Sequence, residues 1–231
     1  MAGMTGDSHG TLSRREVSDA VTGLGWRLVL GELRTQVLTG SLPLAADVAG
    51  RVAALPGTDG HLRMDVRPDR ALLSVQSFAQ ARVTLHDVEL ARRISAMIGQ
   101  ELRLTTRAGA DGDARTVQAL EIGLDALDIP KVRPFWKAVL GYVDETGRGN
   151  GLVDPLGQGP AVWFQQMDTP RPQRNRMHFD VSVPHDEVPE RIEAAVAAGG
   201  RVVTDAEAPA FWVLADPEGN EACITTWQGR D

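Results

Sequence analysis

Residues 121–128 read EIGLDALD and residues 178–185 read HFDVSVPH, and these two stretches decide the fold of the C-terminal half. Each stretch alternates apolar and polar side chains, which is typical of a β-strand with one buried face. Each is followed by a segment with helical spacing that ends at glycine. The helical segments are 132–140, which ends at Gly141, and 188–198, which ends at Gly199 and Gly200. The sequence therefore predicts a repeated strand–helix unit.

Further short strand patterns follow each helix. They lie at 151–153 and 161–167 in the first unit, and at 201–204, 211–215 and 221–226 in the second. A tandem pair of β-α-β-β-β units is too short an array for a solenoid. We expect the two units to form one domain that closes around a shared cleft.

Strand alternation predicts which side chains lie on the sheet face that the helix does not cover. In the first unit Ile122 and Leu124 face the helix, which leaves Glu121 on the opposite face. The same alternation places these side chains on that face: Trp163, Gln165, His178, Asp180 and Cys223. Glu121 and His178 hold equivalent positions in the two units, so we expect a pseudo-two-fold to bring them together.

This half of the chain resembles the glyoxalase-like branch of the vicinal-oxygen-chelate superfamily, over residues 117–227. The resemblance rests on Asp128 with the pairs at 135–136 (FW) and 140–141 (LG), on NRMHFD at 175–180, and on LADPEGNE at 214–221. It implies a divalent metal, either zinc, nickel, manganese or iron, that binds two adjacent oxygens of a small substrate.

The superfamily's ligand positions can be matched to this sequence one at a time. Glu121, Gln165 and His178 match the first three positions, and the resemblance implies that Glu121 also acts as the catalytic base. Cys223 stands at the fourth, where a carboxylate is usual, and a neutral thiol is a weak ligand for a hard cation. We therefore expect Cys223 to line the ligand pocket, together with Trp163, Asp180 and Trp212.

The N-terminal half, residues 11–104, has a mixed α+β pattern. Capping-type sequences begin helices at Ser13 and Thr84, and an apolar stripe over 44–55 predicts a helix between them. This half resembles the pterin-4a-carbinolamine dehydratases, in the order helix, paired strands, helix, strands and helix.

In that family, histidines of a His-His-Pro motif and a Thr-His-Asp motif remove water by general acid–base catalysis. Here those positions hold residues 60–62 (GHL) and 77–79 (SFA), so two of the three histidines are missing. The resemblance implies a domain kept for structure, dimerisation or binding. His61 is then either a residual acid–base catalytic residue or a solvated loop histidine.

Composition limits the classes of function. The 231 residues include 24 Lys and Arg against 31 Asp and Glu, a net charge of −7, which disfavours nucleic acid as a partner. The single cysteine excludes an internal disulfide and a Cys-rich zinc site. We see no membrane span and no signal peptide, and expect a cytoplasmic protein. The stretch 105–116 lacks large apolar residues and predicts a linker, and 1–10 predicts a disordered tail.

The sequence therefore predicts an α+β protein with a dehydratase-like domain at 11–104 and a glyoxalase-like domain at 117–231. The favoured function is a metal-dependent lyase or isomerase acting on a small vicinal-oxygen substrate. One alternative is a metal-free small-molecule binding or resistance protein in which Trp163 and Trp212 stack on the ligand. A second alternative is a 4a-hydroxytetrahydrobiopterin dehydratase. Because both families form oligomers, we expect a homodimer.

Overall fold

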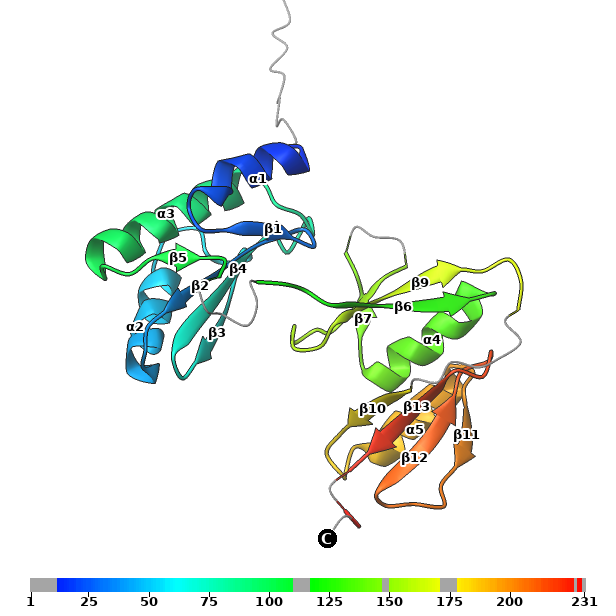
Figure 1. Cartoon of the computed structure of the whole chain (residues 1–231). Helices are drawn as coiled ribbons and strands as arrows, with labels where there is room; N and C mark the ends of the chain where they lie inside the picture. Colours follow the sequence, from blue (N-terminus) through cyan, green and yellow to red (C-terminus); the bar gives the residue numbers. More distant parts are fainter. Residues whose placement is uncertain (1–11, 110–116, 147–149, 171–177, 227, 230–231) are drawn as a thin grey trace, which may run out of the picture. The chain divides into compact units, whose positions relative to one another are not determined.

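A computed structural model of the chain describes residues 12–109, 117–146, 150–170, 178–226 and 228–229. The chain forms two compact units, Met1–Ala119 and Leu120–Asp231. Both are of mixed α+β class, as predicted (Figure 1). The expected tail at 1–10 and residues 175–177 of the NRMHFD motif lie outside the described residues. No helix within the described ranges combines the length and the apolar character that a membrane span needs.

The first unit packs helices against one face of an antiparallel sheet. Its helices are α1 (Arg14–Thr22), α2 (Leu42–Ala53) and α3 (Leu85–Glu101). Its strands run in the order β1 (Arg27–Val29), β2 (Glu32–Leu38), β4 (Arg70–Val75) and β3 (Leu62–Arg67), with β5 (Thr106–Arg107) also paired to β2. Trp26, Leu33, Leu73, Leu90 and Ile94 are fully buried between the helices and the sheet and belong to one apolar core.

Both predicted capping sequences begin helices. The Ser13 hydroxyl accepts the backbone N–H of Glu16, and the Glu16 carboxylate accepts the Ser13 N–H at 2.8 Å. Thr84 and Asp87 make the equivalent pair at the start of α3. Each pair satisfies N–H groups that the first turn of a helix leaves without a partner.

The stretch expected to be a linker, 105–116, begins instead with a strand of the first unit. Thr106 in β5 is buried, and its hydroxyl donates to the Leu24 carbonyl at 2.6 Å and bonds Ser95 at 3.0 Å. Small polar side chains enter this core because their hydrogen bonds are made there, which a search for large apolar residues does not detect. Residues 110–116 lie outside the described part of the chain.

The second unit contains the predicted tandem repeat. The first half comprises β6 (Glu121–Ala126), α4 (Ile129–Leu140), β7 (Val143–Asp144), β8 (Leu152–Val153) and β9 (Ala161–Gln166). The second comprises β10 (Phe179–Ser182), α5 (Val188–Ala197), β11 (Arg201–Thr204), β12 (Phe211–Ala215) and β13 (Glu221–Thr225). The sheets have the orders β6-β9-β8-β7 and β10-β13-β12-β11, in which only the first-named pair of each is parallel.

One apolar core joins the two halves. Trp136 of α4 is buried and meets the Phe179 ring of β10 edge to face, with 5.5 Å between ring centroids. Its indole N–H donates to Asp216, a fully buried carboxylate in the predicted ADPEGN turn, at 3.0 Å. The core-facing residues of both sheets and both helices belong to a single cluster. The remaining face of each sheet therefore points outward, away from the shared core.

Candidate functional site

The outward face of the second sheet gathers a histidine, an aspartate and the single cysteine. β10 and β13 pair in parallel, with Asp180 opposite Cys223 in the register. His178 immediately precedes β10, two residues before Asp180, and so lies on the same face. Phe179 alternates with them and packs against the core. The predicted alternation is therefore present in this half.

These three side chains are close enough to share a ligand. One possible ligand atom from each of His178, Asp180 and Cys223 lies within 4.8 Å of the other two. The His178 Nε2 lies 3.4 Å from an Asp180 carboxylate oxygen. The histidine and aspartate side chains are exposed, whereas Cys223 is 7% exposed. In the described part of the chain these three residues are the group of His, Cys, Asp and Glu whose ligand atoms lie close enough together to reach one cation.

The Cys223 thiol is held in its neutral form. Burial raises its pKa to about 11, and the hydrogen bond to Asp180 and the negative charges of Asp180 and Glu221 act in the same direction. A thiol with a raised pKa is a poor nucleophile, because the thiolate is the reactive form. The cluster therefore lacks the activated cysteine of a thiol enzyme.

The outward face of the first sheet holds the other predicted residues. Glu121 begins β6, and Gln165 in β9 is exposed, with its amide donating to the Gln166 carbonyl at 3.3 Å. The Trp163 ring lies over Gly123, where an added Cβ would come within 3.1 Å of the ring. Trp163 is 40% exposed, which makes it an accessible aromatic surface.

The two predicted groups of residues belong to different sheets of the second unit. Glu121 and Gln165 lie on the outward face of the first sheet, and His178 lies on that of the second, while both inward faces contact the same core. The shared cleft expected between the halves stays a prediction. Glu121 is not part of the three-residue cluster.

Trp212 lies on the other side of the sheet from Cys223. It pairs with Ile224 in the register of β12 and β13, and it packs against the apolar core. The prediction that Trp212 lines the ligand pocket with Cys223 is therefore wrong for this face. Sequence could not separate a core tryptophan from a pocket tryptophan, because both positions favour a large aromatic side chain.

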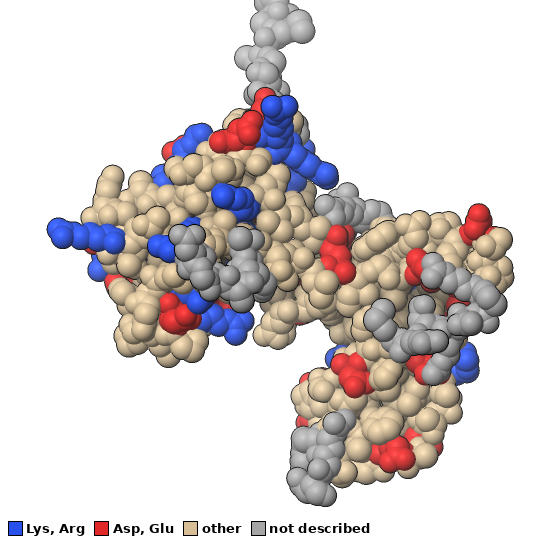
Figure 2. Space-filling view, in the orientation of Figure 1, with Lys and Arg blue, Asp and Glu red and all other residues tan. Residues whose placement is uncertain are grey.

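The donor set of the cluster fits a divalent cation. Imidazole, thiolate and carboxylate are each ligands of zinc in proteins, and a set of three leaves one position open for substrate or water. The charge of this unit also favours a cation, since residues 120–231 contain 10 Lys and Arg against 18 Asp and Glu. Acidic side chains are spread over its visible surface (Figure 2).

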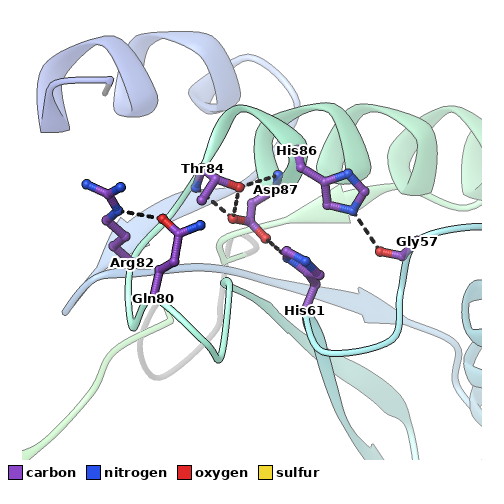
Figure 3. Close-up of polar contacts among 7 residues, drawn as sticks. All are labelled: Gly57, His61, Gln80, Arg82, Thr84, His86 and Asp87. Carbon is purple, nitrogen blue, oxygen red and sulfur yellow. Dashed lines mark hydrogen bonds and ion pairs between the residues drawn. The ribbon is translucent and has the colours of Figure 1, made fainter. Parts of the chain in front are cut away.

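The first unit contains a separate polar cluster around His61. The His61 Nδ1 lies 2.7 Å from one carboxylate oxygen of Asp87, which is fully buried (Figure 3). The other carboxylate oxygen accepts the backbone N–H and the hydroxyl of Thr84, each at 2.6 Å. When Nδ1 donates to the carboxylate, Nε2 becomes the nitrogen that exchanges protons.

A second histidine packs on the first. The His86 ring centroid lies 4.5 Å from that of His61, and its Nε2 lies 2.8 Å from the Gly57 carbonyl oxygen. His61 is therefore oriented by a buried partner and is not a loop residue surrounded by solvent. The sequence analysis interpreted Thr84 and Asp87 only as a helix start and missed the contact with His61. Spacing alone gives no signal of it, since the loop and α3 meet only in the folded unit.

Comparison with known proteins gives a family match for the second unit. Residues 121–225 match the family model described as a glyoxalase-like domain. None of the curated proteins matches the sequence. A glyoxalase/bleomycin resistance protein/dioxygenase family enzyme from Burkholderia phytofirmans is 20% identical, with a TM-score of 0.38, over 46% of this chain and 95% of that chain.

Two further solved structures are similar to parts of the chain. The fosfomycin resistance protein FosX from Listeria monocytogenes, as a mutant with Mn(II) and 1S,2S-dihydroxypropylphosphonic acid, is 15% identical over 48% of this chain and 90% of that chain, with a TM-score of 0.38. A transcriptional coactivator/pterin dehydratase from Brucella melitensis is 20% identical over 38% of this chain and 98% of that chain, with a TM-score of 0.35.

Proposed function

We propose, starting from the glyoxalase-like domain at residues 121–225, that the chain is a metal-dependent lyase or isomerase for a small substrate with two adjacent oxygens. The observation that carries the proposal is the grouping of His178 with Asp180 and Cys223 on an outward sheet face. When bound there, a divalent metal supplies Lewis acidity toward the two substrate oxygens. Zinc, nickel, manganese and iron are the candidates.

In this proposal Glu121 is the base. His178 is a metal ligand, because it belongs both to the three-residue cluster and to the ligand set predicted from the sequence. A neutral imidazole nitrogen of His178 binds the cation. The Glu121 carboxylate would accept a proton from the substrate carbon beside one of the two oxygens and return it to the neighbouring carbon, which completes an isomerisation. Gln165 orients the substrate or completes the ligand set through its amide oxygen. Trp163 supplies an apolar wall beside Glu121.

The proposed site combines Glu121 and Gln165 of one copy with His178 of a second copy of the chain. Glu121 and Gln165 lie on the first sheet and His178 lies at the start of the second, so the proposal places the first sheet of one copy against the second sheet of its partner. A symmetric homodimer builds two such composite sites. The dimer predicted from the sequence is therefore part of the proposed function.

Subunit mixing tests this arrangement. We expect Glu121→Gln and His178→Ala each to abolish metal-dependent turnover of a vicinal-oxygen substrate panel. Mixed with subunit exchange, the two inactive variants form heterodimers with one intact site, so about one quarter of the wild-type activity returns. No recovery from mixing would place both residues in a site of one chain. Full activity of His178→Ala would contradict the metal role.

A metal-free binding protein is the alternative that the exposed Trp163 ring favours. An aromatic face over a glycine offers a stacking surface for a planar or apolar ligand. Tryptophan fluorescence that responds to organic ligands and ignores Zn²⁺, Ni²⁺, Mn²⁺ and Fe²⁺ would favour this function. The response should be lost in Trp163→Phe and retained in Trp212→Phe, because Trp212 packs in the core.

The His61–Asp87 pair favours a second activity, in the first unit. We propose that His61 acts there as a general acid–base residue, with pterin carbinolamine dehydration as the reaction to test. His61→Gln should abolish turnover of a 4a-hydroxytetrahydropterin and leave the metal chemistry of the second unit unchanged. Absence of turnover by the wild-type chain at high enzyme concentration would contradict this second proposal.

A further inference from the structure

The outward face of β10 and β13 differs from an all-oxygen cation site because one of its donors is sulfur. We propose that His178, Asp180 and Cys223 of a single copy bind a thiophilic divalent cation of the zinc and cobalt(II) class. This inference deepens the proposed function and rests on it, since it names the cation class and replaces Glu121 and Gln165 as ligands. Glu121 is then left to act only as the base.

The geometry supports coordination with little rearrangement. Zinc binds imidazole and carboxylate at about 2.0–2.2 Å and thiolate at about 2.3 Å, so tetrahedral ligands lie roughly 3.3–3.8 Å apart. The His178 Nε2 and Asp180 carboxylate are already 3.4 Å apart. All three ligand atoms lie within 4.8 Å. Because the His178 and Asp180 side chains are exposed, rotation about their side-chain bonds can shorten the remaining distances.

The backbone fixes the relative positions of these donors. Parallel pairing holds Asp180 beside Cys223 on neighbouring strands, and the ladder continues to Ser182 and Thr225. The hydroxyls of Ser182 and Thr225 form a hydrogen bond with each other at 2.7 Å. This row, meaning a pair of residues opposite each other in the ladder, therefore satisfies its own polar groups. On that side the cluster therefore ends at the row that contains Asp180 and Cys223.

Coordination by Cys223 requires the loss of its thiol proton. On coordination, sulfur forms the bond to the cation and its proton leaves to solvent, so one proton is released for each cation bound. Softer donors favour zinc and cobalt(II) over manganese and magnesium, which prefer oxygen.

Cobalt(II) titration of the full chain tests the proposal without any assay of turnover. Since Cys223 is the only cysteine, a near-ultraviolet sulfur-to-cobalt charge-transfer band can arise only from this residue. We expect that band to saturate at one cobalt per chain and to be displaced by Zn²⁺. Zn²⁺ should also protect Cys223 from alkylation. Manganese(II) should give neither effect.

Variants of matched size separate ligands from neighbours. Cys223→Ser should remove the charge-transfer band, and Asp180→Asn and His178→Gln should each weaken cobalt binding by about tenfold or more. Ser182→Ala, on the same strand face, should bind cobalt as the wild type does. Circular dichroism of each variant checks its fold. A folded wild type that shows no charge-transfer band, or a band that survives in Asp180→Asn and His178→Gln with unchanged affinity, would overturn the proposal.

The outcomes separate this inference from the proposed function. Glu121→Gln should bind cobalt with wild-type affinity, and it loses turnover only if the catalytic proposal is right. A cobalt band with no turnover of any substrate would leave the cation site in place and contradict the catalytic proposal. Manganese-dependent turnover without a cobalt band would contradict the thiophilic site and leave the catalytic proposal in place.

Discussion

Asp87 uses both of its carboxylate oxygens, and each has a different kind of partner. One oxygen faces the His61 ring, and the other accepts the backbone and hydroxyl hydrogens of Thr84 at the start of α3. The side chain is fully buried, so none of these bonds competes with bulk water. Removing the carboxylate leaves several buried donors unsatisfied, and such groups cost free energy.

We therefore expect the two simplest substitutions of Asp87 to differ. Asp87→Ala should lower the free energy of unfolding by about 2–3 kcal/mol, because Thr84 and His61 both lose an acceptor. Asp87→Asn should cost only about 1 kcal/mol, because its amide oxygen can still accept from Thr84. Urea unfolding gives both values. Equal losses for the two variants would contradict the capping argument.

The same Asn variant should change the tautomer of His61. An amide N–H in place of a carboxylate oxygen donates to Nδ1, which moves the ring proton to Nε2. Nitrogen-15 chemical shifts of the imidazole report the tautomer directly. A variant that keeps its proton on Nδ1 would show that Asp87 does not set the chemistry of His61.

The buried thiol of Cys223 should make the second unit less stable at alkaline pH. Its folded pKa of about 11 lies above that of an exposed thiol, so the folded state favours the protonated form. That contribution to stability is full below about pH 9 and is lost as pH rises through 11. In the metal-free protein, urea midpoints should fall more steeply over this window than in Cys223→Ser, which has no thiol to ionise. Parallel curves for the two proteins would contradict the assignment.

At the scale of elements, the end of α5 depends on close contact with α4. A Cβ added at Gly200 would overlap the fully buried Phe135 ring and approach the Ala195 carbonyl. Two helices that pack between sheets leave no free volume for an additional methyl group. Glycine at this position is therefore a packing requirement.

We expect Gly200→Ala to lower the free energy of unfolding by about 2 kcal/mol, as over-packed cores do. Gly50→Ala is the matched control, because Gly50 lies in α2 with open space where the Cβ would go. That control should stabilise the chain by about 0.5–1 kcal/mol through higher helix propensity. Thermal unfolding gives the midpoint temperatures. A lower midpoint for Gly200→Ala and a higher one for Gly50→Ala would support the packing argument, and an unchanged midpoint for Gly200→Ala would contradict it.

Local patterns predicted most of these elements. The capping pairs at Ser13 and Thr84, and the glycine that ends α4 at Gly141, involve residues a few positions apart, so the sequence itself contains the information. Thr106 was missed because a two-residue strand has no periodicity, and its partners are far along the chain. A strand of this kind is specified by its tertiary hydrogen bonds.

At the scale of the whole molecule, each unit has its own core. The apolar cluster around Trp26 contains residues of the first unit only, and the cluster around Trp136 contains residues of the second unit only. Neither core needs residues of the other unit to be complete. The stability of each unit is therefore expected to be a property of that unit alone.

Expression of residues 120–231 alone tests this independence. We expect the fragment to fold, to retain the cobalt charge-transfer band, and to unfold at the same urea concentration as the corresponding transition of the full chain. Circular dichroism and the absorbance of the cobalt complex are the measurements. A fragment that is unfolded in buffer would show that the first unit contributes to its stability.

The arrangement of the predicted site could be derived only in part from sequence. Alternation correctly places His178, Asp180 and Cys223 on one face, because strand geometry has a fixed period. The direction of that face relative to Glu121 depends on how α4 packs against the second sheet, through contacts such as Trp136 with Phe179. Such contacts join residues far apart in the chain, and a periodic pattern contains no information about them.

Both carboxylate oxygens of Asp87 accept hydrogen bonds, and this affects how sequence variation at position 87 should be interpreted. In a library of variants selected only for soluble, folded chains, position 87 would keep its aspartate without any selection on the chemistry of His61. Retention of Asp87 alone in related chains would thus be no sign that the first unit turns over a substrate. Position 61 is the informative one, because His61 begins no helix and could vary if its proton chemistry were unused.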